Sequence, residues 1–232
     1  MIQAILFDFN GIIVDDEPLQ MRAYQKVLAA EGLTLTEEDY YSLLGTDDVT
    51  FLRRTYERAE RELTDEKLTA IVGAKTRAHR ELLTGEPPLF PGVVNFLKAL
   101  AREYPLGVVS MARREEIEYV FERAALRGVF DVVVAAEDVT ACKPDPGCYN
   151  SALELLNRKR GEAHIVPLQP AECLVVEDAP PGIESARRAG MRTLGVTNTV
   201  GERALREAGA DVVTHSLADW TLDAVRHVFD GR

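Results

Sequence analysis

The sequence predicts an α/β protein with a doubly wound parallel sheet, and three observations support this prediction. Short apolar runs recur along the 232-residue chain, separated by stretches with helical periodicity. The runs are continuously apolar rather than alternating, which is typical of strands buried on both faces of a parallel sheet. A long segment with a purely helical pattern follows the first run and interrupts the alternation. We therefore expect a parallel core sheet with a helical insertion.

Five apolar runs are expected to form strands, and a sixth run is weaker. In chain order they are Ala4–Phe7, Leu106–Val109, Val132–Ala135, Cys173–Val176, Thr193–Val196 and the weaker Asp211–Val213. Some of the intervening helices have recognisable ends. Asp145-Pro146 has the pattern of an N-cap followed by Pro at the first helical position, which predicts a helix running toward Arg158. Pro180-Pro181 predicts the start of another helix, and Gly190 predicts its end.

The helical insertion runs from about Asp15 to Glu86. It has apolar residues at helical spacing and no strand-like run, and Gly32 and Gly45 interrupt it, so we expect about four helices. The segment from Thr84 onward reads Thr-Gly-Glu-Pro-Pro, a composition typical of a linker that returns to the sheet. The sequence thus predicts a core domain of residues 1–14 and 87–232 and a helical cap domain of residues 15–86.

Composition limits the class of protein and its partners. A hydrophobic fraction of 46% and a charged fraction of 28% are those of an ordinary globular protein. Lys and Arg number 27 against 38 Asp and Glu, and the net charge of -11 argues against nucleic acid or an anionic membrane as a partner. A small anionic substrate is compatible with this charge, because a local cation and a few amides reverse the potential inside one cleft.

Cysteine usage and the N-terminus favour a cytoplasmic location. Cys142, Cys148 and Cys173 have no CxxC spacing, so we expect no disulfide framework and interpret all three as small apolar filler beside buried strands. The N-terminus passes directly into a strand without the pattern of a signal peptide, and no apolar run approaches membrane-spanning length. The sequence leaves the oligomeric state open between monomer and dimer.

The first expected strand ends in Asp8-Phe9-Asn10-Gly11-Ile12. A carboxylate at the carboxyl end of a strand, followed by a turn glycine, lies at the edge of an α/β sheet where ligands bind. The segment resembles the first motif of the haloacid dehalogenase (HAD) superfamily, in which the first Asp is a covalent nucleophile. In the phosphatases of that superfamily the residue two places on is usually a second Asp, the general acid/base. Asn10 stands there instead, and its neutral amide cannot transfer a proton.

Two further segments resemble the second and third motifs of the superfamily. Ser110 follows the strand Leu106–Val109, and its hydroxyl and the N–H groups of Met111 and Ala112 are expected at a helix N-terminus, where an anion is stabilised. By itself a Ser after a strand is more often a helix cap. Lys143, in the pattern Lys-Pro-x-Pro, would reduce the repulsion between Asp8 and an incoming phosphate and stabilise the transition state.

The strongest match is the segment that begins Val175-Val176-Glu177-Asp178 and continues through Gly182 to Ala189-Gly190-Met191. It resembles the fourth motif of the superfamily. Two carboxylates at a strand end near Asp8 would provide the oxygen ligands that Mg²⁺ prefers. By resemblance the ligands are Asp8, the backbone carbonyl of Asn10 and Asp178, with Glu177 bound nearby or through water.

The four motifs occur in superfamily order, and the helical insertion resembles the cap of its subfamily I. The motif sequences most resemble those of the β-phosphoglucomutase and phosphoglycolate phosphatase branch. The resemblance implies a Mg²⁺-dependent phosphohydrolase that acts on a small phosphorylated metabolite, with Asp8, Asn10, Ser110 and Lys143 at the catalytic positions. Asn10 would make this an impaired variant, either engineered or natural. The alternatives are a phosphate-binding or regulatory relative with little turnover, and mutase, dehalogenase or phosphonatase chemistry.

The cap departs from the mutase pattern at two places. β-Phosphoglucomutases have a His on the first cap helix at the position of Gln20, which by resemblance places Gln20 beside the substrate. They also have an Arg for the distal phosphate soon after a cap glycine, where this chain has Thr46-Asp47-Asp48 after Gly45. The two acids would repel a second phosphate. We interpret Arg53, Arg54 and Lys75 as exposed helix charges, and regard Arg113 or Arg114, just after Ser110, as the better candidates for a substrate contact.

The acids at the start of the insertion offer one more alternative. Asp15, Asp16 and Glu17 are interpreted as solvated residues at the hinge of the cap, although one of them could take the proton-transfer role that Asn10 lacks. The four histidines belong to none of the motifs, and we interpret all of them as structural or exposed. They are His79, His164, His215 and His227. Trp220 and Phe229 are expected to pack the last helix onto the core.

Overall fold

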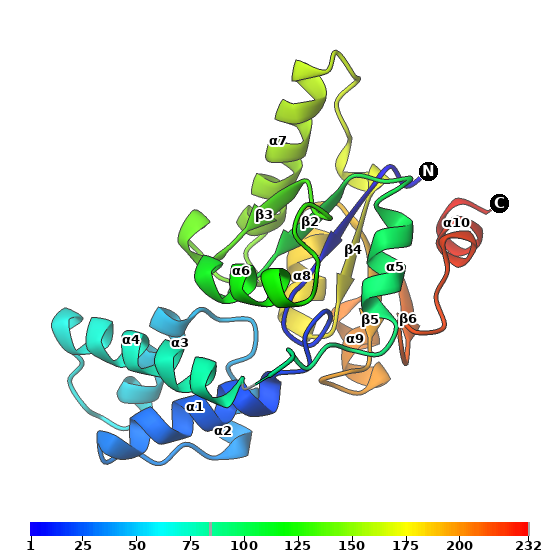
Figure 1. Cartoon of the computed structure of the whole chain (residues 1–232). Helices are drawn as coiled ribbons and strands as arrows, with labels where there is room; N and C mark the ends of the chain where they lie inside the picture. Colours follow the sequence, from blue (N-terminus) through cyan, green and yellow to red (C-terminus); the bar gives the residue numbers. More distant parts are fainter. Residues whose placement is uncertain (84, 232) are drawn as a thin grey trace.

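The computed structural model describes residues 1–83 and 85–231, and its core is a six-stranded parallel sheet (Figure 1). The strands are β1 (Ala4–Phe7), β2 (Leu106–Val109), β3 (Val132–Val134), β4 (Cys173–Glu177), β5 (Arg192–Val196) and β6 (Val212–Thr214). Their order is β3-β2-β1-β4-β5-β6, with every neighbouring pair parallel. This confirms the predicted doubly wound α/β sheet. Most of the observed strands begin or end one residue away from the predicted apolar run. The order reverses between β1 and β4, which is where ligands bind in such folds.

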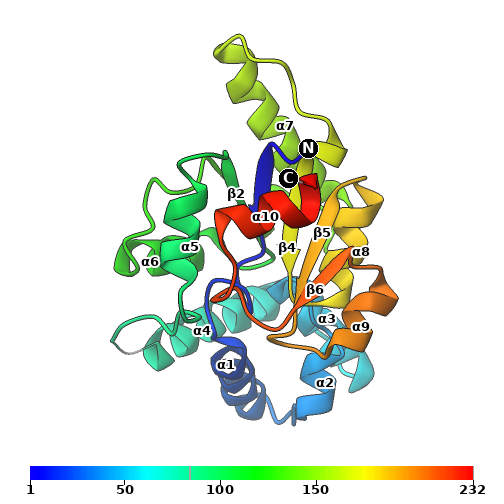
Figure 2. The same cartoon turned by 90° about the vertical axis from the view of Figure 1, so that its right-hand side faces the viewer.

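Helices cover both faces of the sheet (Figures 1 and 2). On one face, alternate strand residues such as Ile5 and Phe7 pack against α5 (Val93–Leu100), α6 (Arg114–Arg123) and α10 (Leu222–Asp230). On the other face, Ala4 and Leu6 pack against α7 (Gly147–Glu162) and α8 (Pro180–Arg188). A smaller cluster joins α9 (Glu202–Ala208) to α8 and β6. Because both faces are covered, the strands are continuously apolar, as the sequence indicated.

The ends of the core helices follow local chemistry. Pro146 is the N-cap of α7 rather than its first residue, so the prediction was one position early; Asp145 Oδ1 accepts from Gly147 N at 2.8 Å. Helix α8 does begin at Pro180, and Gly190 lies just after its end with a φ of 78°. Two short 3₁₀ helices, Ala136–Asp138 and Pro170–Glu172, precede α7 and β4.

The terminal helix and the first strand are tied together. Phe229 is buried in the larger core cluster and Trp220 packs against it, which confirms their predicted place. The backbone N–H of Ile2 donates to Asp230 Oδ1 at 2.7 Å. The two ends of the chain therefore lie on the same side of the core (Figure 2).

Four helices occupy the described part of the insertion, as predicted. They are α1 (Glu17–Ala30), α2 (Glu37–Tyr41), α3 (Asp48–Arg58) and α4 (Asp65–Leu82). The side chains of Thr36, Asp47 and Thr64 each accept a backbone N–H at the start of α2, α3 and α4. The insertion has an apolar cluster of its own, in which Tyr24, Leu28, Leu52, Tyr56 and Ile71 are buried. This separate cluster supports the proposed division into core and cap domains.

The chain leaves the core and returns to it at adjacent points. Val14 and Leu89 form an antiparallel bridge, and Asp15 N donates to the Pro88 carbonyl at 2.6 Å. The two connections between cap and core therefore run side by side (Figure 1). Thr84, in the predicted return linker, lies outside the described residues.

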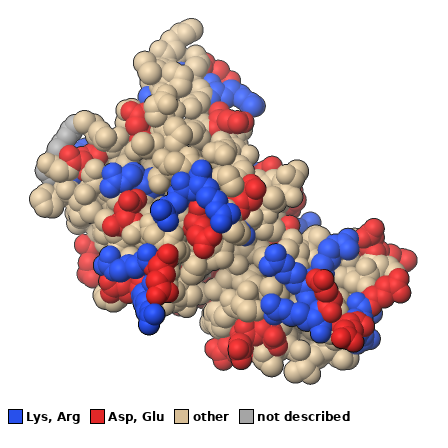
Figure 3. Space-filling view, turned by 180° about the vertical axis from the view of Figure 1, so that it is seen from behind, with Lys and Arg blue, Asp and Glu red and all other residues tan. Residues whose placement is uncertain are grey.

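The surface and the cysteines add two observations. In the described part of the chain no helix is both long and apolar enough to cross a bilayer, and acidic and basic side chains are intermixed over the face seen in Figure 3. The three cysteines are free, and Cys148 and Cys173 are buried as expected. Cys142 is half-buried: it packs against the apolar cluster beneath α7 and α8, and its Sγ also lies 3.4 Å from Asp47 N and from Thr50 Oγ1 at the start of α3.

Candidate active site

A pocket lies between the carboxyl ends of the central strands and the cap helices. What we call its core wall comes from the loops after β1, β2 and β4 and the loop before α7: Asp8, Asn10, Ser110, Lys143, Glu177 and Asp178. What we call its cap wall comes from helices α1 to α4: Glu17, Gln20, Tyr24, Tyr40, Asp48, Phe51 and Lys75. The core wall lies where the strand order reverses, so the sheet topology itself brings together the ends of β1 and β4.

Lys143 is the central cation of the core wall. Its Nζ donates to Asp8 Oδ1 at 2.7 Å, to Glu177 Oε1 at 2.6 Å and to the Val109 carbonyl at 3.2 Å. The Lys143 side chain is only 3% exposed, so water screens these contacts weakly. Burial alone would lower the pKa of Lys143, but the Asp8 and Glu177 carboxylates raise it well above its usual value. Lys143 is therefore a permanent positive charge in contact with Asp8.

The carboxylates of the core wall outnumber this cation. Asp8, Glu177 and Asp178 each place an oxygen within 4.8 Å of the others. Burial raises the pKa of Asp8 to about 7, against the opposing effect of Lys143. Burial, followed by the charge of Glu177, raises the pKa of Asp178 well above its usual value. A buried, under-compensated group of carboxylate oxygens is a donor set that fits a hard divalent cation such as Mg²⁺.

Two glycines allow these carboxylates to approach the backbone closely. At Gly11, where φ is 75°, a Cβ would lie 1.9 Å from Asp178 Oδ2. At Gly182, in the first turn of α8, a Cβ would lie 1.8 Å from Glu177 Oε1. No side chain fits at either position without displacing an acid of the core wall.

Glu177 differs from the other two acids because its oxygens are already occupied. Oε1 accepts from Lys143 and from the Tyr149 hydroxyl at 3.0 Å. Oε2 accepts from the backbone N–H groups of Asp178 at 3.0 Å and Ala179 at 3.2 Å. Glu177 thus holds Lys143 and the loop after β4 in place. Asp8 and Asp178 are the more available carboxylates for a metal.

The loop after β2 forms another side of the core wall. Ser110 is almost fully buried, and its Oγ accepts from Ala112 N at 3.0 Å. Met111 and Ala112 line the pocket with it, at the turn that leads into α6. The structure therefore brings Ser110, Met111 and Ala112 to the same pocket as Asp8 and Lys143.

The structure places Arg113, a predicted substrate contact, outside the pocket. Arg113 is absent from the described residues that line the pocket, and its guanidinium pairs instead with Glu115 at 3.0 Å and Glu137 at 3.4 Å. Arg114 likewise forms an ion pair with Asp138. Both arginines are used on the surface of the core, because the turn after Ser110 directs them toward acids of α6 and the loop after β3.

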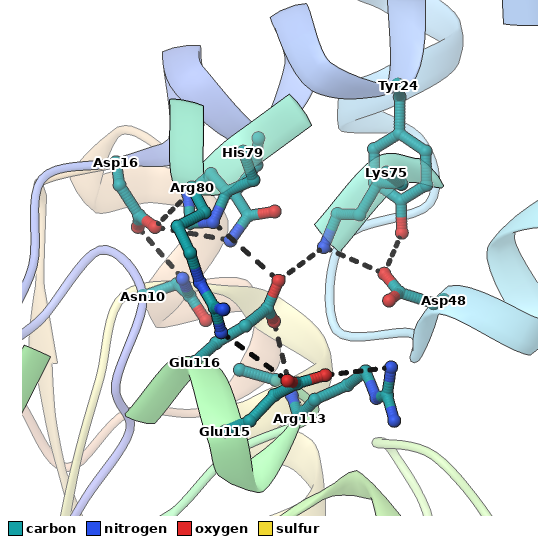
Figure 4. A network of polar contacts seen from close by, with 12 residues as sticks. Asn10, Asp16, Tyr24, Asp48, Lys75, His79, Arg80, Arg113, Glu115 and Glu116 are labelled. Carbon is teal, nitrogen blue, oxygen red and sulfur yellow. Dashed lines mark hydrogen bonds and ion pairs between the residues drawn. The ribbon is translucent and has the colours of Figure 1, made fainter. Parts of the chain in front are cut away.

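Asn10 has a matched partner in the hinge of the cap (Figure 4). Its Nδ2 donates to Asp16 Oδ1 at 2.8 Å. Asp16 Oδ2 accepts from Gln20 Nε2 at 3.2 Å and lies 2.9 Å from His79 Nε2. Asp16 is fully buried, so its interpretation as a solvated hinge residue was wrong. A carboxylate at position 10 would face this buried acid directly, and the amide of Asn10 avoids that repulsion.

The other two hinge acids have different environments. Asp15 is exposed, as expected. Glu17 lines the pocket, and the Tyr40 hydroxyl donates to its Oε2 at 2.5 Å. Burial raises the pKa of Glu17 to about 7, with further contributions from Asp16 and Asp8. Glu17 was therefore also wrongly interpreted as solvated, because the first turn of α1 faces the core wall.

Lys75 belongs to a buried network rather than to the surface (Figure 4). Its side chain is 3% exposed, and Nζ lies 2.9 Å from Asp48 Oδ1 and 3.2 Å from Glu116 Oε1. The Tyr24 hydroxyl also donates to Asp48 Oδ1. The interpretation of Lys75 as an exposed charge was wrong, because α4 packs this face onto α6. The two cap arginines fit the interpretation, since Arg53 pairs with Asp65 at the surface and Arg54 is exposed.

His79 completes the connection between cap and core. It is buried, as a structural histidine would be, and its Nδ1 lies 3.6 Å from Glu116 Oε1. The one signal in the sequence for this network is spacing: Lys75 and His79 are four residues apart and so share one face of α4. Their partners come from distant parts of the chain, and no local pattern indicates them.

Comparison with known proteins identifies the family. The family model described as haloacid dehalogenase-like hydrolase matches residues 5–196. The chain belongs to this family. A phosphorylated carbohydrates phosphatase of Thermotoga maritima is 31% identical to this chain, and the aligned region covers 90% of this chain and 92% of the relative's length. Fructose-1-phosphate phosphatase YqaB of Escherichia coli is 30% identical over 83% of this chain and 95% of its own.

Solved structures agree with the fold. CbbY from Rhodobacter sphaeroides, in complex with phosphate, has a TM-score of 0.80 and 28% identity, covering 97% of this chain and 99% of its own. A mutant of the same protein, in complex with xylulose-(1,5)bisphosphate, matches to the same extent. β-Phosphoglucomutase from Clostridium difficile, at 20% identity and a TM-score of 0.82, shares the fold.

Proposed function

We propose that the protein is a Mg²⁺-dependent phosphatase that hydrolyses a small phosphorylated metabolite through an aspartyl-phosphate on Asp8. The buried contact between Asp8 and Lys143, beside Asp178, is the observation that carries this proposal. The names of the relatives support it, since one is a phosphatase of phosphorylated carbohydrates and another of fructose-1-phosphate. The proposed location is the cytoplasm, as expected from the sequence.

In the first step an Asp8 oxygen attacks phosphorus and the bond to the ester oxygen breaks, with a proton going to the departing alcohol. In the second step water attacks the aspartyl-phosphate, gives up a proton, and releases phosphate and free Asp8. Lys143 and the donors of the loop after β2, namely the Ser110 hydroxyl and nearby N–H groups, bind the phosphoryl oxygens. They act where negative charge develops in the transition state.

The core wall also has the ligands for the metal. Asp8, the backbone carbonyl of Asn10 and Asp178 would hold Mg²⁺, with Glu177 adjacent. When bound, the ion supplies positive charge that reduces the repulsion between the carboxylates and an incoming phosphate. Replacement of Asp by Asn at position 10 leaves this set intact, because the ligand there is a backbone oxygen.

Proton transfer is the part that Asn10 cannot perform. Glu17 is the best-placed hinge acid, because it lines the pocket while both oxygens of Asp16 are occupied. A pKa of about 7 suits a group that both donates and accepts a proton near neutral pH. We assign Glu17 the general acid/base role. It comes from the cap, so this role is available only when the cap lies over the core.

A screen of phosphorylated metabolites with Mg²⁺ tests the proposal. We expect phosphate release that depends on Mg²⁺ and is abolished by Asp8→Ala, while the matched change Asp15→Asn at the exposed hinge acid has little effect. Unchanged release in the Asp8→Ala variant would contradict the nucleophile role.

A second candidate function is a phosphate-binding relative with little turnover, which Asn10 favours. Calorimetry with Mg²⁺ and vanadate distinguishes it, because tight binding without hydrolysis of any ester supports the binding function. Dehalogenase chemistry is less favoured, since superfamily dehalogenases dispense with the metal and the acidic cluster is intact here. The missing cap His and Arg disfavour a mutase.

A further inference from the structure

The far end of the pocket, on the cap wall, has hydrogen-bond acceptors without partners. Asp48 Oδ1 takes both the Tyr24 hydroxyl and Lys75 Nζ, and Oδ2 has no hydrogen-bond partner among the described residues. Gln20 donates through Nε2 to Asp16, and its Oε1 is likewise without a partner. Both residues are more than nine-tenths buried and line the pocket. A buried acceptor without a donor is unfavourable, because it has lost its hydrogen bonds to water and gained none within the protein.

The charge at this end is negative. Lys75 is the cation of the cap wall within the described lining, and it contacts two carboxylates, Asp48 at 2.9 Å and Glu116 at 3.2 Å. A third carboxylate, Glu17, lines the same side. The carboxylates therefore outnumber Lys75, and the net charge that this end presents to an anionic group of a ligand is negative.

The apolar part of the cap wall is aromatic. The rings of Tyr24 and Phe51 stack with their centroids 4.0 Å apart, and Tyr40 packs beside them. Flat aromatic rings next to hydrogen-bonding groups suit the C–H faces and hydroxyls of a polyol or sugar. Acceptors, aromatic rings and net negative charge thus occur together at one end of the pocket.

We propose that the cap wall is a subsite for the hydroxyl-bearing end of the substrate, which Asp48 and Gln20 bind through their free acceptor oxygens and from which a second phosphate is excluded. This inference rests on the proposed function for the position of the reacting phosphate at the core wall. It narrows the substrate to monophosphates of polyols or sugars. A relative at 28% identity has been solved with a bisphosphate, so the subsite would separate this chain from that protein.

Binding can be measured separately from turnover. In an Asp8→Asn background, which keeps an oxygen at that position and removes the nucleophilic carboxylate, calorimetry with Mg²⁺ compares three probes: fructose-1-phosphate, fructose-1,6-bisphosphate and n-hexyl phosphate. We expect the sugar monophosphate to bind about tenfold or more tightly than the bisphosphate, which meets like charge, and than the hexyl ester, which lacks donors. Equal or tighter binding of the bisphosphate would overturn the inference, as would equal binding of the hexyl ester.

Two variants assign the effect to the subsite. Adding Asp48→Asn removes one negative charge and keeps an oxygen for Tyr24 and Lys75. The preference for fructose-1-phosphate over the bisphosphate should therefore become smaller. The matched change Asp65→Asn, at a 91% exposed side chain on the cap surface, should leave the preference unchanged. Equal shrinkage in both variants would mean that the overall charge, and not the subsite, discriminates. Failure of phosphatase activity alone, with these binding ratios intact, would contradict only the proposed function.

Discussion

Each wall of the pocket has a buried lysine between two carboxylates, but the two lysines have different roles. On the core wall Lys143 contacts two acids while Asp178 adds a further negative charge nearby, which leaves a site that fits a metal ion and a phosphate. On the cap wall Lys75 contacts Asp48 and Glu116, and Asp48 Oδ2, which has no partner among the described residues, is the acceptor that we propose for a substrate hydroxyl. The comparison shows that a buried lysine alone does not indicate an anion site. The carboxylates around it must also be able to bind a second cation, here the metal ion. Charge balance, more than residue type, separates the catalytic wall from the recognition wall.

Exchanging each lysine for methionine should separate the two walls most strongly. Lys143→Met removes a donor to the transferred phosphoryl group, and we expect phosphate release to fall by about 10²–10³-fold. Lys75→Met should reduce release of phosphate from a simple monoester much less, because its contacts are within the cap and α6. Each change leaves buried carboxylates without their cation and should destabilise the fold by about 3–5 kcal/mol.

Thermal unfolding in parallel with kinetics makes this comparison interpretable. The surface change Lys98→Met on α5, where the lysine is exposed, should alter the stability by less than about 0.5 kcal/mol. Equal kinetic losses in the two buried-lysine variants, when both are folded, would contradict the division between the walls.

Glu17 is the one acid of the cap wall to which we assign chemistry. Glu17→Gln keeps the size of the side chain and the acceptor for Tyr40 but removes the titratable proton, so we expect the rate of phosphate release to fall about tenfold or more. The acidic limb of the pH–rate profile should change as well. A variant that keeps the native rate and profile would remove Glu17 from the mechanism and leave Asp16 as the remaining buried hinge acid.

Glu17→Gln should also change the pH dependence of the free energy of unfolding in a known direction. Because the folded-state pKa of Glu17 is raised to about 7 from 4.5, the folded protein holds this proton more tightly than the unfolded chain. Its contribution to stability is present below the unfolded pKa and is lost as the pH rises through the folded pKa. Denaturant unfolding of the metal-free protein should show a smaller loss of stability over this pH range in Glu17→Gln than in the native chain.

Two glycines test how tightly the core wall and helix α4 of the cap are packed. In Gly182→Ala a Cβ would lie 1.8 Å from Glu177 Oε1, so α8 or the acid must move, and we expect a destabilisation of about 1–3 kcal/mol. In Gly73→Ala, in the middle of α4, the nearest atom is the end of Arg77 at 3.4 Å, and the change should stabilise the cap by about 0.5–1 kcal/mol. Urea unfolding of both variants checks this, and equal effects would refute it.

The sequence predicted the core wall better than the cap wall for a physical reason. Asp8, Ser110 and Asp178 each directly follow a strand, and the parallel sheet brings such positions to one edge, while Lys143 lies in the loop before α7 that the Lys-Pro-x-Pro pattern marks. Local sequence therefore determined where they lie. The roles of Glu177 and Gly182 could not be read in the same way, because the close packing of one against the other is visible only in three dimensions.

The cap wall was predicted only in outline. Helical periodicity gave the four helices, but Asp16, Glu17 and Lys75 were interpreted as solvated charges. Asp16 and Lys75 are buried and Glu17 is half-buried because the cap lies against the core, and that contact joins residues far apart in the chain, such as Lys75 and Glu116. A charged residue in a helix gives the same local pattern whether its partner is water or a distant acid.

Asn10 connects the two walls, and its pairing with Asp16 determines how it should be tested. A single Asn10→Asp change would set two carboxylates against each other, because Asn10 Nδ2 now lies 2.8 Å from Asp16 Oδ1. The double exchange Asn10→Asp/Asp16→Asn reverses the pair, preserving the net charge and providing both a donor and an acceptor for the contact.

The central claim is that the core wall has every catalytic group except one for proton transfer. The rate of Mg²⁺-dependent phosphate release by this double variant tests that claim most directly. We expect it to exceed that of the native chain on the same monoester by about 10²-fold, because an acid/base group on the core wall acts whether or not the cap lies over the core, which Glu17 cannot do; Asp8→Ala should abolish the gain. A folded, Mg²⁺-binding double variant that releases phosphate no faster than the native chain would contradict the claim.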